Sequence, residues 1–193
     1  MSTLDYEELA ALNRAAFQEY AGSQNLRGVT MTAAALRESM AETGQTAFIL
    51  RVDKRVAAYC RGYISETPEG KCLHAEGCAA HPAYRGCGYA KEIILQRERW
   101  GKESGAVFAE LSTSVKAKNA IGFHCACGYR KYGYVYYQGK NYLSVVMRKY
   151  FETPMAESVR LRHLVKSWFR HNLVYNKNGR KRIWMRLKKR LIG

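Results

Sequence analysis

The stretch HPAYRGCGYAKEI, residues 81–93, decides the fold. It places a proline after an apolar segment, then two glycines one residue apart, then an apolar helical pattern. Glycines so close together let the backbone turn sharply or come near something bulky or charged. A helix that begins there would present free N–H groups, which favour an anion. The stretch predicts a strand–loop–helix unit, and either a phosphate-bearing ligand or a tight turn alone would explain the glycines.

Two familiar phosphate-binding motifs do not match this loop. The dinucleotide motif needs a third glycine where the chain has Lys91. A Walker loop needs a Gly-Lys-Ser/Thr sequence, which does not follow. A phosphate-bearing ligand would therefore be held in another way, with Arg85 as a charged donor beside the glycines.

The order of predicted elements around the loop favours an α+β fold, with a mixed, mostly antiparallel sheet flanked by helices. The helix ahead of the first strand is expected to have its N-cap at Thr32 and its stop at Gly44. The predicted helices cover residues 4–21, 30–44, 88–105 and 117–128, and the predicted strands lie in a hairpin over 46–65, at 71–80 and 106–114, and in a hairpin over 129–150.

The predicted strand before the loop is KCLHAEGCAA, residues 71–80. Strict alternation would place His74, Glu76 and Cys78 on one face and the residues between them on the other. Pro82 ends the strand, because proline has no N–H to donate to a ladder.

Composition limits the kind of protein that this can be. The chain has 193 residues, 47% of them apolar, which is enough for a core. It has no apolar run of about 18 residues, and its N-terminus lacks the order of a secretory leader, so a cytoplasmic location is expected. The six cysteines lack zinc-ligand spacing and are expected to be reduced thiols, with no metal bound.

Positive charge is concentrated in residues 151–193. Twelve basic residues against two acidic ones give this segment a net charge of +10, which leaves +6 of the total of +16 for residues 1–150. An apolar stripe and a turn at 176–179 predict a basic helical hairpin here. The stripe comprises Leu161, Leu164, Val165, Trp168, Phe169 and Leu173.

Three blocks of the sequence resemble the GNAT superfamily of acyl-CoA-dependent acyltransferases. RGCGYA at 85–90 is similar to the family signature Arg/Gln-x-x-Gly-x-Gly/Ala. LSTSVKAKNAIGFHCACGY at 111–129 and VVMRK at 145–149 resemble two later blocks, in the right order and spacing. The resemblance covers roughly residues 5–150 and implies a GNAT-like fold whose first strand is short or absent, because this chain opens on a helix.

The resemblance implies that acetyl-CoA is the co-substrate. Its pyrophosphate would lie on the main-chain amides of the loop, and its pantetheine arm on the preceding strand and an asparagine. The residues that match these family positions are Arg85, Gly86, Cys87, Gly88, Tyr89 and Ala90 for the pyrophosphate, and Cys78, Ala79, Ala80 and Asn119 for the pantetheine arm. Asn119 could also be an ordinary residue at the start of a helix.

Amide formation from an amine and a thioester needs a neutral amine, a polarised carbonyl and a proton for the leaving thiolate. Many family members use a carboxylate on the strand before the loop as the base, which implies Glu76 here, with His74 as second choice. The family's acid is often a tyrosine four residues before the closing Gly-aromatic pair, and that position is His124. His124 can donate a proton as imidazolium, or the position can lack an acid role.

We therefore predict an N-acetyltransferase domain over residues 1–150 and a basic helical extension over 151–193. The acceptor is a primary amine, which could be a small amine, an antibiotic, a peptide N-terminus, a protein lysine or an aminoacyl-tRNA. The alternative is a CoA-binding or partner-binding module with little turnover. Residues 155–193 could bind an anionic membrane surface, which would make the protein peripheral, or RNA, or could pack on the body or on a second copy in a homodimer.

Overall fold

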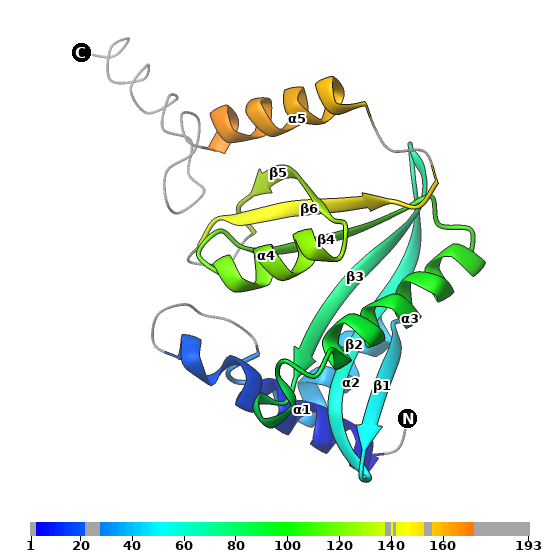
Figure 1. Cartoon of the computed structure of the whole chain (residues 1–193), viewed down its shortest axis with the longest axis vertical. Helices are drawn as coiled ribbons and strands as arrows, with labels where there is room; N and C mark the ends of the chain where they lie inside the picture. Colours follow the sequence, from blue (N-terminus) through cyan, green and yellow to red (C-terminus); the bar gives the residue numbers. More distant parts are fainter. Residues whose placement is uncertain (1–2, 22–27, 138–139, 141, 153–155, 172–193) are drawn as a thin grey trace. The chain divides into compact units, whose positions relative to one another are not determined.

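The computed structural model describes residues 3–21, 28–137, 140, 142–152 and 156–171. The chain forms two compact units, Met1–Ala109 and Glu110–Gly193. Its strands belong to a six-stranded sheet in the order β1-β2-β3-β4-β6-β5 (Figure 1). The pairs β1–β2, β2–β3 and β5–β6 are antiparallel. The predicted α+β class, with a mostly antiparallel sheet and flanking helices, is confirmed.

The N-terminal unit begins with two helices, α1 (Thr3–Phe17) and α2 (Ala33–Glu42). Thr32 is the N-cap of α2, and its side chain accepts a hydrogen bond of 3.1 Å from the N–H of Ala35. Gly44 follows the helix with a φ of 60°, a conformation that glycine adopts without strain. The predicted cap and stop of this helix are confirmed.

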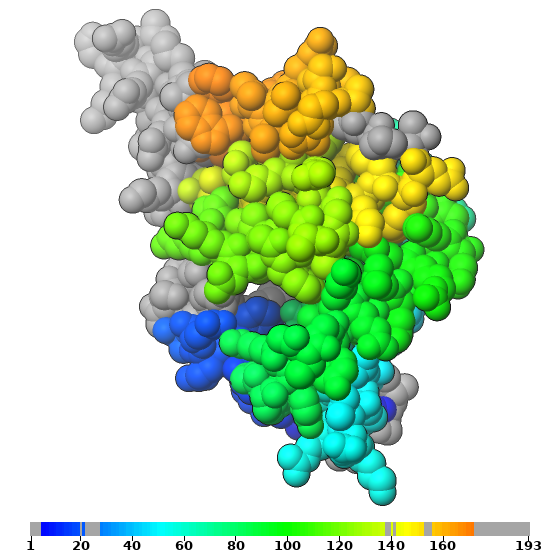
Figure 2. All heavy atoms as spheres, in the orientation of Figure 1, coloured from blue at the N-terminus to red at the C-terminus, as the bar shows by residue number. Residues whose placement is uncertain are grey.

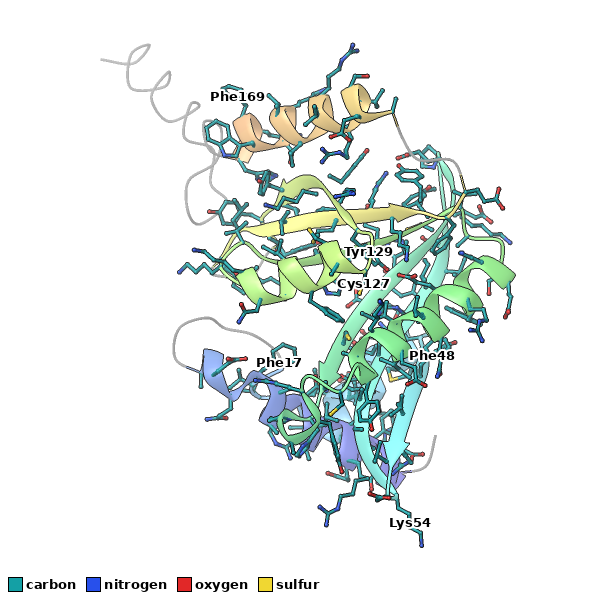
Figure 3. The ribbon with its side chains drawn as sticks, in the orientation of Figure 1. Phe17, Phe48, Lys54, Cys127, Tyr129 and Phe169 are labelled. Carbon is teal, nitrogen blue, oxygen red and sulfur yellow. The ribbon has the colours of Figure 1, made fainter. Side chains whose placement is uncertain are left out.

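Three strands follow as two successive hairpins, β1 (Thr46–Val52), β2 (Arg55–Thr67) and β3 (Gly70–Ala80). Asp53 and Lys54 connect β1 to β2, and both have positive φ, 48° and 66°, as a two-residue hairpin turn requires. Lys54 projects at the tip of this hairpin (Figure 3). Pro82 then starts a short 3-10 turn, Pro82–Tyr84, after β3 has ended.

The two faces of this strand group are covered by different helices. Leu9 of α1 and Leu36 of α2 pack with Tyr59 and Ala79 in one cluster of buried side chains. Helix α3 (Tyr89–Glu103) covers the other face, where Ile93 packs against buried residues of β2. Residues 59 and 60 of β2 therefore point to opposite helical layers, as strand alternation requires.

A β-bulge interrupts the pairing of β2 with β3. Cys78 opposes Cys60, whereas Glu76 opposes Arg61, so Gly77 is an extra residue, with a φ of 29°. Because cross-strand partners share a face and neighbours alternate, Cys78 lies on the face opposite to that of Glu76. The predicted common face is therefore wrong for Cys78.

The described part of the C-terminal unit contains two helices, two paired strands and most of a strand that crosses the unit boundary. Gly128 ends the first helix with a φ of 93°, as the sequence predicts. The second helix of the predicted basic hairpin lies outside the described residues. The elements from the unit boundary onward are β4 (Phe108–Ser114), α4 (Lys118–Ala126), β5 (Arg130–Val135), β6 (Ser144–Tyr150) and α5 (Glu157–Phe169).

One serine joins α5 to the terminal strand of the sheet. The Oγ of Ser167 donates to the carbonyl of Tyr134 at 2.8 Å and accepts from the N–H of Tyr134 at 2.6 Å. Gly133 is buried beside this contact, and a Cβ there would lie 3.2 Å from the Oγ of Ser167. An edge strand has unpaired backbone groups, and here a helix satisfies one pair of them. Within the described ranges, no helix combines the length and apolar character needed to cross a bilayer.

We expect Ser167→Ala to loosen α5 from β5. Removal of two hydrogen bonds should cost about 1–3 kcal/mol of local stability, and the amide of Tyr134 should exchange its hydrogen faster by tenfold or more. Ser158→Ala is the matched control, because Ser158 is an exposed serine of the same helix. Hydrogen exchange followed by mass spectrometry measures both, and equal exchange in the two variants would contradict the role of Ser167.

Candidate functional site

The glycine loop between β3 and α3 has two residues in the left-handed region. Gly86 and Gly88 have φ values of 83° and 84°, and Gly88 is the N-cap of α3. A Cβ built on either glycine would have no heavy atom within 4 Å. The glycines are therefore needed for backbone conformation, and the space beside them is open to a ligand.

The loop presents consecutive main-chain donors that have no acceptor in the described part of the chain. The N–H of Arg85 is bonded to the carbonyl of Pro82 at 3.3 Å, and the N–H groups of Lys91 and Glu92 are bonded to the carbonyl of Gly88 at 3.0 and 3.1 Å. Between them, the N–H groups of residues 86–90 have no such bond. Main-chain donors without an acceptor at the N-terminus of a 15-residue helix favour an anion.

The side chain of Arg85 points toward α1. One guanidinium nitrogen donates to the carbonyl of Ala16 at 2.9 Å and lies 3.5 Å from a carboxylate oxygen of Glu19. The arginine thus ties the loop to the end of α1. On the other side of the loop, the Nδ1 of His81 accepts from the N–H of Ala83 at 3.2 Å.

Buried Arg97 of α3 holds the bulge that precedes the loop. Its guanidinium donates to the carbonyl of Arg61 at 3.2 Å and to the carbonyl of Glu76 at 3.3 Å, and the side chain is 1% exposed. The bulge leaves these carbonyls available on the α3 side. Arg97 therefore fixes the backbone that carries Glu76. Sequence analysis missed this residue, although its spacing from Ile93 and Ile94 places it on the inner face of the helix.

The two predicted bases on β3 have different surroundings. Glu76 is exposed, and its cross-strand partner Arg61 is buried and donates to the Oε1 of Gln45 at 2.9 Å. The Nε2 of His74 lies 2.8 Å from the Oγ of Ser65, and its ring stacks on that of Tyr63 at 4.7 Å. His74 is thus held by its neighbours within the sheet, whereas Glu76 is open to solvent.

The pantetheine positions lie on both faces of β3 after the bulge. Cys78 and Ala80 pack on the α3 side with Cys60, whereas Ala79 packs in the cluster on the α1 side. Because these side chains lie on different faces, the three residues could bind the same pantetheine arm only through their main-chain groups. The family resemblance implies the same main-chain contact.

Asn119 and His124 belong to the C-terminal unit. Asn119 is exposed in the first turn of α4. His124 is half-buried in the last turn, and its ring lies 5.3 Å from that of Phe123 and 5.6 Å from that of Tyr129. These residues are therefore positioned within their own unit, and their roles toward a ligand remain predictions.

All six cysteines are free thiols. Cys87 is exposed in the glycine loop, whereas Cys60 is buried under α3, where desolvation raises its pKa to about 12. The described residues contain no group of three or more His, Cys, Asp and Glu side chains that could hold a metal ion.

The thiol of Cys87 should therefore react much faster than the thiol of Cys60. At pH 8 a pKa of about 12 leaves only about one part in ten thousand of Cys60 as the reactive thiolate. We expect an aromatic disulfide reagent to label Cys87 rapidly in the native protein and Cys60 only after unfolding. Cys87→Ser should remove the fast phase, and Cys125→Ser, at a half-buried cysteine, is the comparison. Rapid native labelling of Cys60 would contradict the packing of α3.

The comparison with protein families agrees with this geometry. The model of the acetyltransferase (GNAT) family matches residues 8–129, which include the bulged strand, the glycine loop and α4. The chain therefore belongs to the GNAT acetyltransferase family, and the predicted resemblance is confirmed.

Solved structures of this family share the fold at low sequence identity. A ribosomal-protein-alanine N-acetyltransferase from Brucella melitensis is 12% identical, with a TM-score of 0.61 over 78% of this chain and 97% of that one. A GNAT acetyltransferase from Streptococcus pneumoniae is 15% identical, with a TM-score of 0.59 over 78% and 96%. The PaiA N-acetyltransferase from Thermoplasma acidophilum, solved with coenzyme A, is 14% identical, with a TM-score of 0.58 over 78% and 96%. No curated protein sequence matches the chain.

Proposed function

We propose that this protein transfers an acetyl group from acetyl-CoA to a primary amine by direct attack, with no covalent enzyme intermediate. The observation that carries the proposal is the run of N–H groups at residues 86–90, which have no acceptor in the described part of the chain. The run includes two glycines in the left-handed conformation, Gly86 and Gly88. A diphosphate supplies the charge and the acceptor oxygens that such a run of donors favours.

The loop and the strand before it would share the binding of acetyl-CoA. The amides of residues 86–90 would bind the pyrophosphate, and Arg85 would keep the loop in place through its contacts with α1. The main chain of Cys78–Ala80 and the side chain of Asn119 would bind the pantetheine arm. Other members support this choice of co-substrate, since the PaiA enzyme was solved with coenzyme A.

In the proposed reaction the amine nitrogen attacks the thioester carbonyl, a C–N bond forms and the C–S bond breaks. Glu76 takes the proton of the amine, directly or through a water molecule, and His124 gives a proton to the leaving thiolate. Glu76 is preferred over His74 as the base, because His74 is already bonded to Ser65 and stacked on Tyr63. A lysine-like amine has a pKa of about 10.4, so it needs such a base near neutral pH.

We assign the catalytic domain to residues 1–150 and the basic extension to 151–193, and we expect a cytoplasmic protein. Residues 155–193 would bind an anionic membrane surface or RNA, or would pack on the body or on a second copy in a homodimer. The second candidate function is a CoA-binding or partner-binding module with little turnover, which the histidine in place of the family's usual tyrosine favours.

The glycine loop is tested by Gly88→Ala. The added methyl group would occupy the open space beside the amides and displace the diphosphate, so we expect the Kd for acetyl-CoA to rise tenfold or more. Gly44→Ala is the matched control, because Gly44 also has positive φ and a Cβ there would have no heavy atom within 4 Å. Both variants should lose about 1 kcal/mol of stability through backbone strain. Calorimetric titration would refute the site if the two variants bind acetyl-CoA equally well.

The role of Glu76 is tested by Glu76→Gln. Loss of the base should lower kcat by about 10²- to 10⁴-fold, while the KM for acetyl-CoA stays unchanged. The rate of the variant should recover as pH rises, because hydroxide then supplies the neutral amine. Glu66→Gln, at an exposed glutamate of β2, is the control.

Release of the coenzyme A thiol with a panel of amines measures the rates of both glutamate variants. Similar rates for the two would remove Glu76 from the mechanism. Binding of acetyl-CoA without thiol release for any amine would favour the module.

A further inference from the structure

Helix α5 has an apolar stripe on its outer side. Its residues are spaced i, i+4, i+7 and i+8, which places them on one side of a helix. They are Leu161, Val165, Trp168 and Phe169, exposed by 44%, 51%, 46% and 49%. Figure 3 marks Phe169 at the end of this helix, and Figure 2 shows atoms of α5 on the surface. The stripe thus leaves four large apolar side chains about half in water.

A different side of the same helix holds it to its own unit. Ser167 is bonded to the backbone of Tyr134, and the guanidinium of Arg160 donates to the carbonyl of Lys131. Because these contacts orient the helix, the stripe cannot turn toward β5 without breaking them. The alternative in which the stripe packs on its own unit is therefore not what the described residues show.

The row of charges that runs along the stripe is positive. Arg162, Lys166 and Arg170 form an exposed row one residue along from the stripe. The only acid of the helix, Glu157, is paired with Arg160 at the other end. Residues 172–193 add eight basic residues and no acidic one. The partner that covers the stripe must therefore accept apolar side chains and neutralise positive charge at the same time.

Other occupants meet only one of these two requirements. A second copy packed symmetrically on α5 would bring its row of basic residues against the first, and residues 172–193 folded back would do the same. RNA would neutralise the charges but would offer no apolar interior to the valine and leucine of the stripe.

We propose that α5 docks this protein on an anionic lipid surface. The stripe enters the boundary between headgroups and acyl chains, and the row Arg162, Lys166 and Arg170 lies against anionic headgroups. Apolar burial and electrostatic attraction to anionic lipids are the two contributions by which amphipathic helices bind membranes, and α5 offers both. The inference does not depend on acetyl transfer, because the docking surface consists of residues of α5 and of Arg170 beside it.

The test measures binding of the full chain to vesicles of phosphatidylcholine with and without phosphatidylglycerol, at low and high salt. We expect binding only with the anionic lipid, and weaker binding at high salt. Val165→Glu should weaken it tenfold or more, whereas Leu95→Glu, at a leucine of α3 that is 46% exposed, should not. Lys166→Gln with Arg170→Gln should weaken it by about 25-fold, at roughly fivefold for each charge, and Arg99→Gln with Lys102→Gln on α3 is the control.

Three results would overturn the proposal. Equal binding to neutral and anionic vesicles would show that charge has no part in it. Unchanged binding of Val165→Glu would mean that α5 does not enter the lipid and that another segment binds. A dimer in analytical ultracentrifugation that Val165→Glu dissociates, without lipid binding by the original chain, would assign the stripe to a second copy. Circular dichroism of each variant checks that the fold is kept.

Discussion

The contact between Arg97 and the bulge in β3 is the constraint on which the candidate site depends. A guanidinium that is 1% exposed is costly to bury unless acceptors surround it, and the displaced carbonyls of Arg61 and Glu76 supply two of them. The bulge in turn needs Gly77, because a Cβ there would lie 2.7 Å from the Nε of Arg61. The bulge in β3 therefore stabilises the buried arginine of α3, and the arginine stabilises the bulge. The backbone of Glu76 is fixed by this contact.

Much of the fold could be predicted from sequence because local signals agree with the tertiary structure. Thr32 and Gly44 mark the ends of α2, and apolar periodicity separates helices from strands along the chain. The bulge could not be predicted by counting residues, since alternation assumes that every residue has a cross-strand partner. The glycine inside an apolar strand, Gly77, was the signal for a bulge. A glycine alone does not show whether the residues before it or those after it change face.

The candidate site was predictable in its backbone and less so in its side chains. Gly86 and Gly88 identify a loop with free N–H groups, because only glycine adopts that conformation without cost. The direction of the Arg85 side chain depends on Ala16 and Glu19, which are far away in sequence and follow from the packing of α1. A motif specifies which residue lies beside a ligand. The contacts of that residue's side chain depend on elements that the motif does not contain.

Three glycines with positive φ, at 77, 86 and 88, lie within twelve residues of the chain, and the first has a different physical reason from the other two. At Gly77 the neighbouring Arg61 leaves no room for a side chain, whereas at Gly86 and Gly88 the space is open. Contacts at both ends hold the loop while its amides are free: the N–H of His81 donates to the carbonyl of Ala57 in β2, and Arg85 donates to the carbonyl of Ala16 in α1. Donors fixed in this way lose little entropy when an anion binds, so the rigid surroundings strengthen binding without touching the ligand.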